Sequence, residues 1–421
     1  MEKRDVIAGL DVGSGRVTVA IGAIETGKPG VTVLAGASVA CAGVKGGLAT
    51  DIQAASAAIR AAVEEAEKAA GEHVSSVYLG VRGDHLKSST SRGRHVIARP
   101  DREITARDVE AAVKNAEASS LSEDRVLLHV TPQGFILDGR RAVSNPVGMM
   151  ASLLDVDAHI VTADAAALET LEKAVNDAGF SVAEPVYGLL AAAELVLTPT
   201  ERELGCLLFD IGGETMSVGY FDKDSILLSR ELAVGSDSFT RDVAYALHAS
   251  LDTAEQLKVA HGLSDRQIVW RDADAPRLRS DGRVQASRKS NLRRLMAPRV
   301  KHVFSEVSAA VLAAGLGRPI HGAVLTGGGS LLKGLDRDVA KLLDTDARIG
   351  VARAHPRLAA IPAELLAARY VTAVGLLLYS SERDRGRPAD GEPSLIPWDH
   401  PWLRWIKELL EEVFERGEPA K

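Results

Sequence analysis

The chain of 421 residues is poor in several residue types, and each shortage excludes a class of protein. The only cysteines are Cys41 and Cys206, too few for a disulfide framework or a cysteine-based zinc site, so we expect a reducing compartment. Acidic residues outnumber basic ones by 57 to 50, and the net charge of −7 argues against a protein that coats nucleic acid. The first residues contain too short an apolar run for a signal-peptide core, and no run reaches the ~18 apolar residues of a membrane-spanning helix. We therefore expect a cytosolic protein that binds no nucleic acid.

Aromatic residues are also scarce, at 4%, yet three of the four tryptophans lie close together near the C-terminus, at Trp398, Trp402 and Trp405. At 100° per residue, one face of a helix over 401–417 is apolar and the other is charged. A charged linker rich in Pro and Gly, over 384–400, precedes this helix. The apolar face carries Trp402, Leu403, Trp405, Ile406, Leu409, Leu410, Val413 and Phe414.

This pattern favours a helix that lies in the plane of a membrane surface. Between Trp402 and Gly417 there are three basic and four acidic residues, so burial of apolar surface is the main expected driving force. Docking onto the protein's own body and pairing with a coiled-coil partner are the alternatives.

An internal repeat divides the chain into two similar halves. The segments Ile7–Gly15 and Leu207–Thr215 are both apolar runs that end in Asp-x-Gly, and alternating apolar positions follow each of them. Each copy predicts a strand, a tight turn and a second strand. Two such turns facing each other across a cleft can offer N–H groups to a phosphate chain, while Asp11 and Asp210 hold a hydrated Mg²⁺ ion. The candidate residues of the turns are Asp11, Gly13, Ser14, Gly15, Arg16, Asp210, Gly212, Gly213 and Thr215.

A third glycine motif lies in the segment His321–Leu335, where an apolar strand is followed by Gly327, Gly328 and Gly329. We expect a helix to follow, with Ser330 as its capping residue. A glycine run at a helix N-terminus exposes N–H groups and lets the chain approach a ligand closely, which suits the adenosine side of a nucleotide. Taken alone, the motif fits an ordinary strand-to-helix loop equally well.

Two further regions interrupt the halves. Residues 84–165 read as a small α+β insertion, with a helix after Ile104 capped by Thr105 and strand-like runs at Val126–Val130 and Gly134–Leu137. Residues 240–312 are mostly helical in pattern. They contain a basic cluster where a helix could present charge beside Leu292, Leu295 and Met296, although a solvated helix face is equally possible. The cluster consists of Arg288, Lys289, Arg293, Arg294, Arg299 and Lys301.

The three glycine motifs resemble the phosphate 1, phosphate 2 and adenosine motifs of the actin, Hsp70 and sugar kinase superfamily. The segment Val182–Ala193 resembles the first connecting helix of that superfamily. The resemblance implies an α/β fold of the actin/Hsp70 type, with a duplicated ribonuclease-H-type core in two lobes around a nucleotide cleft, and ATP and Mg²⁺ as cofactors. It makes Glu184 the candidate for orienting an attacking water, and a helix-start Glu that favours the helix dipole is the alternative. Hydrolysis, if present, is expected to be slow.

Longer stretches are similar to the bacterial FtsA cell-division family, and this similarity covers essentially the whole chain. The segments 77–105, 128–138, 145–149 and 154–161 resemble that family's inserted subdomain 1C. The stretches 232–242 and 254–258 resemble the part of the family that closes over the nucleotide. The resemblance implies phosphate, ribose and base contacts by Gly235, Glu255 and Lys258, although an exposed helical i,i+3 pair explains Glu255 and Lys258 as well.

By the same resemblance, the chain divides into subdomains that alternate along the sequence. The implied ranges are subdomain 1A over 1–83, 166–200 and 358–383, subdomain 1C over 84–165, subdomain 2A over 201–239 and 313–357, and subdomain 2B over 240–312, before the linker and the terminal helix.

The function implied is that of an actin-like ATP-binding protein that assembles into filaments and tethers FtsZ filaments to the inner face of the cytoplasmic membrane at the division site. The acidic C-terminal tail of FtsZ would bind the basic cluster, and later division proteins would bind subdomain 1C. Head-to-tail contacts give open filaments, and many weak membrane helices in one filament add up. The alternatives are a PilM-like pilus-assembly scaffold, which shares a similar inserted subdomain, and a sugar or acid kinase, for which no catalytic carboxylate stands out.

Overall fold

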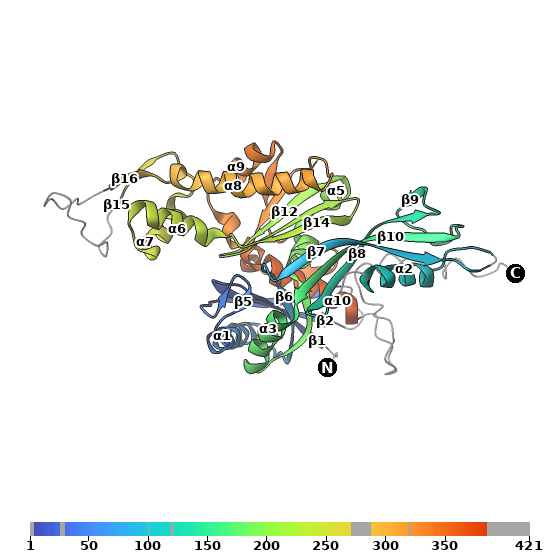
Figure 1. Ribbon diagram of the computed structural model, residues 1–421. Coiled ribbons are helices and arrows are strands. Elements are labelled where there is room, and N and C mark those ends of the chain that lie inside the picture. The colour runs from blue at the N-terminus through green and yellow to red at the C-terminus, as the bar shows by residue number, and fades with distance from the viewer. Residues whose placement is uncertain are drawn as a thin grey trace.

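The structure is a computed structural model that describes residues 4–25, 30–99, 101–118, 122–270, 288–319 and 321–384. Two lobes lie one above the other in Figure 1, and a smaller inserted domain projects to the right of them. Lobe I, at the bottom, carries α1 (Ile52–Ala70) and α3 (Ala165–Asp177). Lobe II, at the top, carries α8 (Leu292–Ala313) and α9 (Leu335–Leu343). The described residues therefore form three parts, and both ends of the inserted domain return to lobe I.

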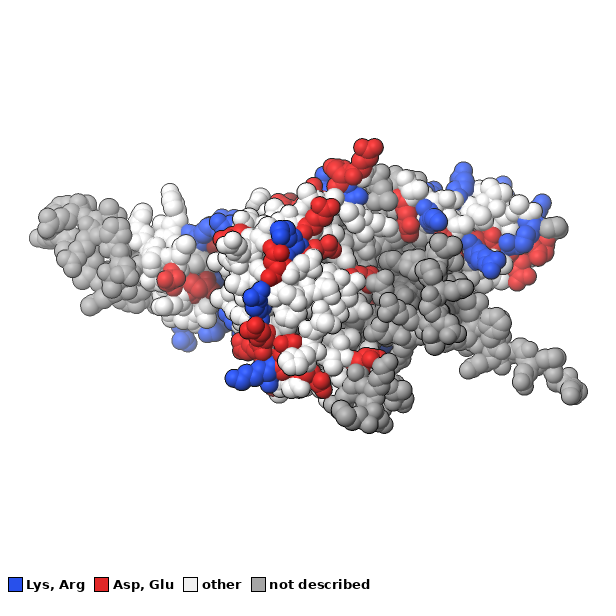
Figure 2. All heavy atoms as spheres, turned by 90° about the horizontal axis from the view of Figure 1, so that it is seen from below, with Lys and Arg blue, Asp and Glu red and all other residues white. Residues whose placement is uncertain are grey.

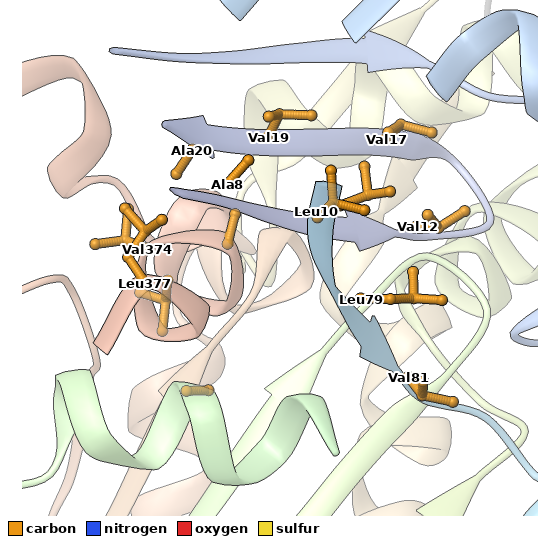
Figure 3. Packing of buried hydrophobic residues seen from close by; sticks show 14 of the residues in the cluster. Ala8, Leu10, Val12, Val17, Val19, Ala20, Leu79, Val81, Val374 and Leu377 are labelled. Carbon is orange, nitrogen blue, oxygen red and sulfur yellow. The ribbon is translucent and has the colours of Figure 1, made fainter. Parts of the chain in front are cut away.

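Lobe I is built on a six-stranded sheet in the order β11-β6-β1-β2-β3-β19, in which β1 is antiparallel to β2 and parallel to β6. Helices α4 (Gly188–Val196) and α10 (Val371–Asp384) pack on each other, and α10 lies against β1, β2 and β6. Their side chains meet in one core that includes Leu10, Leu79 and Val374 (Figure 3). The strands are β1 (Arg4–Val12), β2 (Arg16–Glu25), β3 (Val31–Ala40), β6 (Ser76–Val81), β11 (Ser181–Tyr187) and β19 (Leu358–Ala360), with a small hairpin of β4 (Val44–Lys45) and β5 (Leu48–Ala49) after β3.

Lobe II repeats this architecture. Its sheet has the order β14-β13-β12-β17-β18, and the strand directions match those of β3-β2-β1-β6-β11 in lobe I. The two central hairpins close with the same bond, because the Gly13 N–H donates to the Arg16 carbonyl at 3.0 Å and the Gly212 N–H to the Thr215 carbonyl at 2.8 Å. The expected two-lobed fold with a duplicated core is confirmed. The strands are β12 (Cys206–Ile211), β13 (Met216–Asp222), β14 (Ser225–Leu232), β17 (Ala323–Thr326) and β18 (Ala347–Ile349).

The helices of lobe II share a single apolar core with its sheet. Phe209 of β12 packs on Phe304 of α8 with ring centroids 5.0 Å apart. Buried residues of α6 (Ser236–Leu247), α7 (Leu251–His261), α8 and α9 belong to the same core, so the described helices of 240–312 pack directly on the sheet of lobe II. The other elements of lobe II are α5 (Pro199–Leu204), β15 (Gln267–Trp270), β16 (Arg288–Asn291) and η1 (Gly328–Leu331); η2 (Ala363–Leu366) and η3 (Ala368–Tyr370) lead into α10.

The inserted domain has a four-stranded antiparallel sheet, in the order β7-β10-β8-β9, and its own apolar core. The helix expected after Ile104 is present as α2, and the Asp108 carboxylate accepts the Thr105 N–H at 2.8 Å. The two expected strand-like runs are in fact one continuous strand, because Gln133 bulges between Pro132 and Gly134 and the ladder continues past it. The elements are β7 (Leu86–Val96), α2 (Ala106–Ala118), β8 (Arg125–Leu137), β9 (Arg141–Val143) and β10 (Leu153–Asp164).

Hydrogen bonds fix the inserted domain to both lobes. His159 Nε2 lies 2.9 Å from the Ser229 hydroxyl of lobe II, and the Gln133 amide donates to carbonyls of β14 at 3.0 Å. On the other side, the Tyr187 N–H of lobe I donates to His129 Nε2 at 2.9 Å. A change in the angle between the lobes must therefore strain or move these contacts.

Among the helices of the described residues, none is long and apolar enough to cross a membrane. On the face shown in Figure 2, acidic and basic side chains are interspersed, and neither sign covers a continuous area there.

Candidate functional site

The two Asp-x-Gly turns bring Asp11 and Asp210 together between the lobes, at the carboxyl ends of β1 and β12. Both carboxylates contact the guanidinium of Arg82, whose Nη2 lies 2.8 Å from Asp11 Oδ2 and 3.2 Å from Asp210 Oδ2. Thr372, at the start of α10, accepts a hydrogen bond from Arg82 and donates one to Asp210 Oδ2, both at 3.1 Å. All four side chains are buried; Asp210 is 1% exposed and Arg82 is 7% exposed.

Burial and charge act against each other in this group. Burial raises the pKa of Asp11 to about 6, although the Arg82 guanidinium lowers it. Burial also lowers the pKa of Arg82, but attraction to Asp11, Asp210 and Glu231 outweighs this and raises the net pKa above its ordinary value. Arg82 is therefore a permanent cation in contact with both carboxylates.

The glycine motif of η1 packs directly against Asp210. A Cβ atom on Gly327 would lie 2.3 Å from Asp210 Oδ1, and one on Gly329 would lie 2.4 Å from Ile211 Cγ2. Side chains at these positions would push the third motif away from the second. By contrast, a Cβ on Gly328 or on Gly15 would meet nothing within 4 Å, so these two glycines face open space where a ligand can approach.

The loop before α6 closes on the second turn from the other side. A Cβ on Gly235 would lie 2.3 Å from the Gly213 carbonyl oxygen, and the Asp237 N–H donates to that same carbonyl at 2.8 Å. Glycine at position 235 is therefore needed for this close approach of two backbones. The structure thus brings Gly212, Gly213 and Gly235 together, as the sequence motifs suggest, with Thr215 buried just behind them.

The expectation that Ser330 caps an α-helix is wrong. The glycines enter a 3₁₀ turn, and the Ser330 hydroxyl donates to the Gly327 carbonyl at 2.7 Å. The hydroxyl therefore closes its own turn, and the α-helix α9 begins only at Leu335, after Gly334 in a left-handed conformation. Ser330 stabilises the glycine loop instead of a helix terminus.

Glu255 and Lys258 are part of a polar cluster between α6 and α7. Lys258 Nζ lies 2.6 Å from Glu255 Oε2 and donates to the Thr240 hydroxyl at 2.9 Å and to the Ser236 carbonyl at 3.1 Å. Because Lys258 is only 5% exposed, the pair is more than a solvated helix pair. The cluster ties α7 to the first turns of α6, directly after Gly235.

Two candidate residues are not brought to the carboxylates. The guanidinium of Arg16 lies along β3, where Nε donates to the Ser38 hydroxyl at 2.8 Å. The strand β6 lies between β1 and β11, so its residues show how the two outer strands are aligned. Glu184 of β11 pairs with Tyr78 of β6, whereas Asp11 of β1 pairs with Gly80 of β6. At ~3.3 Å per residue, Glu184 therefore lies about two residues, or roughly 7 Å, below the level of Asp11 along the strands. Ser14 remains in the first turn, partly buried.

The sequence motifs missed a third carboxylate, the half-buried Glu231 of β14. It accepts hydrogen bonds from the Tyr187 hydroxyl at 2.8 Å, the Ser217 hydroxyl at 2.9 Å and the Gly83 N–H at 3.0 Å. Burial raises its pKa to about 7, although these three hydrogen bonds lower it. Tyr187 belongs to lobe I, Ser217 to lobe II and Gly83 to the entry into the inserted domain, so Glu231 joins all three parts. A cavity of about 480 Å³ lies beside it, between β7, β14 and α8.

The sequence motifs also missed Arg82 and Thr372, because both lie outside the glycine motifs and reach the aspartates through contacts between distant parts of the chain. One signal for Arg82 exists: it directly follows the apolar strand that runs parallel to β1, and the carboxyl ends of neighbouring parallel strands meet at one edge of a sheet. Thr372 sits in an otherwise apolar helix segment and gives no signal of its own.

The basic cluster is only partly accessible. Arg288 and Lys289 lie in β16 and not on a helix, because α8 begins at Leu292. Arg293 forms an ion pair with Asp338, and Arg299 Nε lies 2.5 Å from Asp242. Leu292 and Met296, expected as contact residues, are buried in the core of lobe II. Arg294 and Lys301 remain exposed on α8.

The residues of the expected membrane helix lie outside the described residues. These are Trp402, Leu403, Trp405, Ile406, Leu409, Leu410, Val413 and Phe414.

Two lobes built on equivalent sheets, with an Asp-x-Gly turn from each lobe facing the other, define the actin-like class of proteins. Solved structures agree with this fold. The structure titled PilM-PilN type IV pilus biogenesis complex matches with a TM-score of 0.62 at 19% identity over 88% of this chain and 97% of that chain. MreB5 of Spiroplasma citri bound to ADP matches with a TM-score of 0.50 at 13% identity over 89% of this chain and 96% of that chain.

Sequence comparison then identifies the family. A family model described as "SHS2 domain inserted in FTSA" matches residues 83–162, and one described as "Cell division protein FtsA" matches residues 207–375. Cell division protein FtsA of Borreliella burgdorferi is 31% identical over 91% of this chain and 92% of its own length, and that of Pseudomonas aeruginosa is 29% identical over 90% of each. Cell division protein FtsA of Escherichia coli (strain K12) is 27% identical over 98% of this chain and 99% of its own length. The chain belongs to the FtsA family of cell-division proteins.

Proposed function

We propose that this chain is an ATP-binding division protein that assembles into filaments and tethers FtsZ filaments to the inner face of the cytoplasmic membrane at the division site. The observation that carries the nucleotide part is the convergence of Asp11, Asp210 and the η1 glycines in one buried place between the lobes. Membership of the FtsA family supports the division role.

The donor set suits a hydrated Mg²⁺ ion. Asp210 Oδ1 is buried and has no hydrogen-bond partner among the described residues, so an acceptor is available for a water of the ion. Mg²⁺ is commonly bound by one or two protein carboxylates when substrate phosphates and waters supply the remaining oxygens, and Asp11 and Asp210 fit this arrangement. Bound there, the ion would neutralise phosphate charge, and Asp11 and Asp210 would hold it through water.

The nucleotide would lie along the glycine turns. The N–H groups of Ser14 and Gly15 on one side and of Gly213 on the other would bind phosphates. The N–H groups of Gly13 and Gly212 close the two hairpins, and Gly235 lies behind the second turn. The adenosine would lie between the loop Gly327–Ser330 and the cluster of Glu255 and Lys258. The position of Glu184, below the level of Asp11, supports at most slow hydrolysis, with Glu184 acting through water.

The membrane contact would be made by the helix at 401–417. Its expected apolar face carries two tryptophans, which suit the boundary between lipid headgroups and acyl chains. The test is liposome co-sedimentation of the full chain and of a chain ending at Asp384. Replacing Trp402 and Trp405 by Ala should release the protein, while replacing Glu411 and Glu412 by Ala, on the polar face, should not. Continued pelleting of the shortened chain would refute this anchor.

The FtsZ tail would bind the exposed part of the basic cluster. Arg294 and Lys301 lie two turns apart on α8, so they can present positive charge along one helix face to an acidic peptide. Reversing both to Glu should weaken the binding of an FtsZ tail peptide in fluorescence anisotropy. The matched control reverses Arg107 and Lys114, which have the same spacing on the exposed face of α2. Equal effects of the two double variants would argue against a site on α8.

The remaining contacts are proposed by family likeness. Later division proteins would bind the inserted domain, and head-to-tail contacts would build the filament. The fold likeness to the PilM-PilN complex keeps a pilus-assembly scaffold as the second candidate. A scaffold of that kind needs no membrane helix of its own, so the co-sedimentation test above separates the two.

A further inference from the structure

Arg82 is the one basic side chain, in the described part of the chain, that contacts both aspartates of the paired turns. It follows β6 directly, so the backbone of lobe I fixes its position at the carboxyl edge of the sheet. Asp11 belongs to lobe I and Asp210 to lobe II, and Thr372 on α10 completes the ring. Arg82 thus links the two lobes through their two aspartate turns.

The guanidinium of Arg82 is bound through only one of its three nitrogens among the described contacts. Its hydrogen bonds and ion pairs with described residues all run through Nη2, which lies 2.8 Å from both oxygens of Asp11. Nε is buried and has no hydrogen-bond partner among the described residues, and Nη1 lies 3.6 Å from where a Cβ of Gly212 would stand. The two-pronged pairing that makes arginine–carboxylate contacts strong is absent here. A guanidinium held in this way can be displaced by a stronger cation.

Arg82 and the proposed Mg²⁺ ion would have the same role, because each places positive charge between the two carboxylates. Two buried carboxylates on opposite lobes repel each other unless a cation lies between them. In the structure that cation is the guanidinium, and the same two carboxylates are the proposed ligands of hydrated Mg²⁺. One ion and one guanidinium cannot both occupy the space between the same oxygens.

We propose that Arg82 is the resident counter-ion of the cleft: it holds the lobes together through Asp11 and Asp210 when no divalent cation is present, and the cation of Mg-nucleotide displaces it. The proposal rests on the proposed nucleotide function for the identity of the cation's carrier, but its core can be tested with the metal alone. Arg82 is a positioning residue in this account, because it sets the spacing of the carboxylates and not the chemistry on the nucleotide.

The test is thermal unfolding of the full chain with and without millimolar MgCl₂ and no nucleotide. Wild type should unfold at the same temperature in both conditions, because its counter-ion is built in. Arg82→Met, which keeps the length and removes the charge, should unfold at a lower temperature, and MgCl₂ should restore several degrees of the loss. Arg82→Lys keeps a cation and should show a smaller loss and a smaller magnesium response than Arg82→Met.

Specificity of the response is checked by a second change. In Arg82→Met with Asp210→Asn, the magnesium response should disappear, because one of the two carboxylates that hold the ion is neutral. If Arg82→Met unfolds early and MgCl₂ restores nothing, Arg82 is merely structural and the proposal is wrong. If wild type responds to MgCl₂ as strongly as Arg82→Met, the guanidinium does not occupy the ion's place and the proposal is also wrong.

Poor folding of the variant does not block the test. If Arg82→Met is recovered folded only when MgCl₂ is present, that recovery supports the proposal, and failure in both conditions overturns it. Calorimetry of wild type with Mg-ADP tests the nucleotide function separately. Absence of ADP binding there would refute the proposed function and leave the result with the metal alone intact.

Discussion

The backbone N–H of Gly46 donates a hydrogen bond of 2.9 Å to Glu214 Oε2, and this bond joins the two lobes beside the second phosphate turn. Gly46 is the tip of the β4–β5 hairpin of lobe I, and Glu214 lies in the turn between β12 and β13. The same carboxylate forms an ion pair with Arg241, whose Nη1 lies 3.8 Å from Glu214 Oε1. A carboxylate thus lies beside the turn along which a phosphate chain is proposed to lie.

Glu214→Gln should therefore tighten the binding of Mg-ADP. The change removes one negative charge near the phosphates, which at the effective dielectric of a protein surface is worth about 1 kcal/mol, or roughly fivefold in affinity. Isothermal titration calorimetry measures it, with Glu203→Gln, an exposed position in the same lobe, as the control. Unchanged or weaker binding by Glu214→Gln would show that this carboxylate does not oppose the nucleotide.

Asp210→Asn should weaken Mg-ADP binding by about 30-fold or more. The amide keeps the shape but removes the charge that holds Arg82 and the proposed ion, and losing one partner of a buried charge pair typically costs about 2–5 kcal/mol. The control is Asp224→Asn in an exposed turn of the same sheet, where asparagine tolerates the left-handed backbone. Calorimetry should find a loss only for the first variant, and equal affinities would remove Asp210 from the site.

Glu231, which contacts lobe I, lobe II and the entry into the inserted domain, makes the stability of the folded chain depend on pH. Its pKa in the folded chain is about 7, above the usual 4.5, so the folded state holds this proton more tightly than the unfolded state does. The stabilisation is complete below about pH 4.5 and is lost as the pH rises through 7, a change on the order of 1–3 kcal/mol. Urea unfolding between pH 5 and 8 should show a falling midpoint in wild type and a flatter profile in Glu231→Gln. An exposed control, Glu64→Gln, should keep the wild-type slope; the same slope in Glu231→Gln would contradict the assignment.

The inserted domain offers a matched pair of glycines. A Cβ on Gly93 would lie 1.9 Å from the Ala112 carbonyl oxygen of α2, whereas one on Gly134 of β8 would meet nothing within 4 Å. Gly93→Ala should push α2 off the sheet and cost about 1–3 kcal/mol, while Gly134→Ala should be nearly neutral. Hydrogen exchange of amides in 86–164 measures the difference. Similar protection in both variants would mean that α2 is not packed on β7 as described.

Much of the fold was predictable because its signals are local. Each Asp-x-Gly turn lies between apolar strands that are adjacent in sequence, so the repeat at Asp11 and Asp210 was enough to predict two equivalent lobes. Ser330 was misjudged because a serine after glycines can close a 3₁₀ turn or cap a helix, and only the path of the following residues decides between them.

The rest of the site depends on contacts between residues far apart in the chain. Arg82 and Thr372 are 290 positions apart, and neither belongs to a motif that names its partner. The ion pairs within the basic cluster could not be predicted for the same reason, because Asp338 and Asp242, which pair with Arg293 and Arg299, cannot be located from the local sequence. Charge in a sequence shows what a segment can bind, but not whether the fold has already supplied the partner.

The central claim, a protein that couples FtsZ to a membrane, is tested most directly by co-sedimentation of FtsZ with liposomes in the presence of this chain and Mg-ATP. FtsZ should pellet with the liposomes when the full chain is added and stay in the supernatant when the chain ends at Asp384. Recovery of FtsZ in the supernatant with the full chain, while that chain itself pellets, would contradict the account.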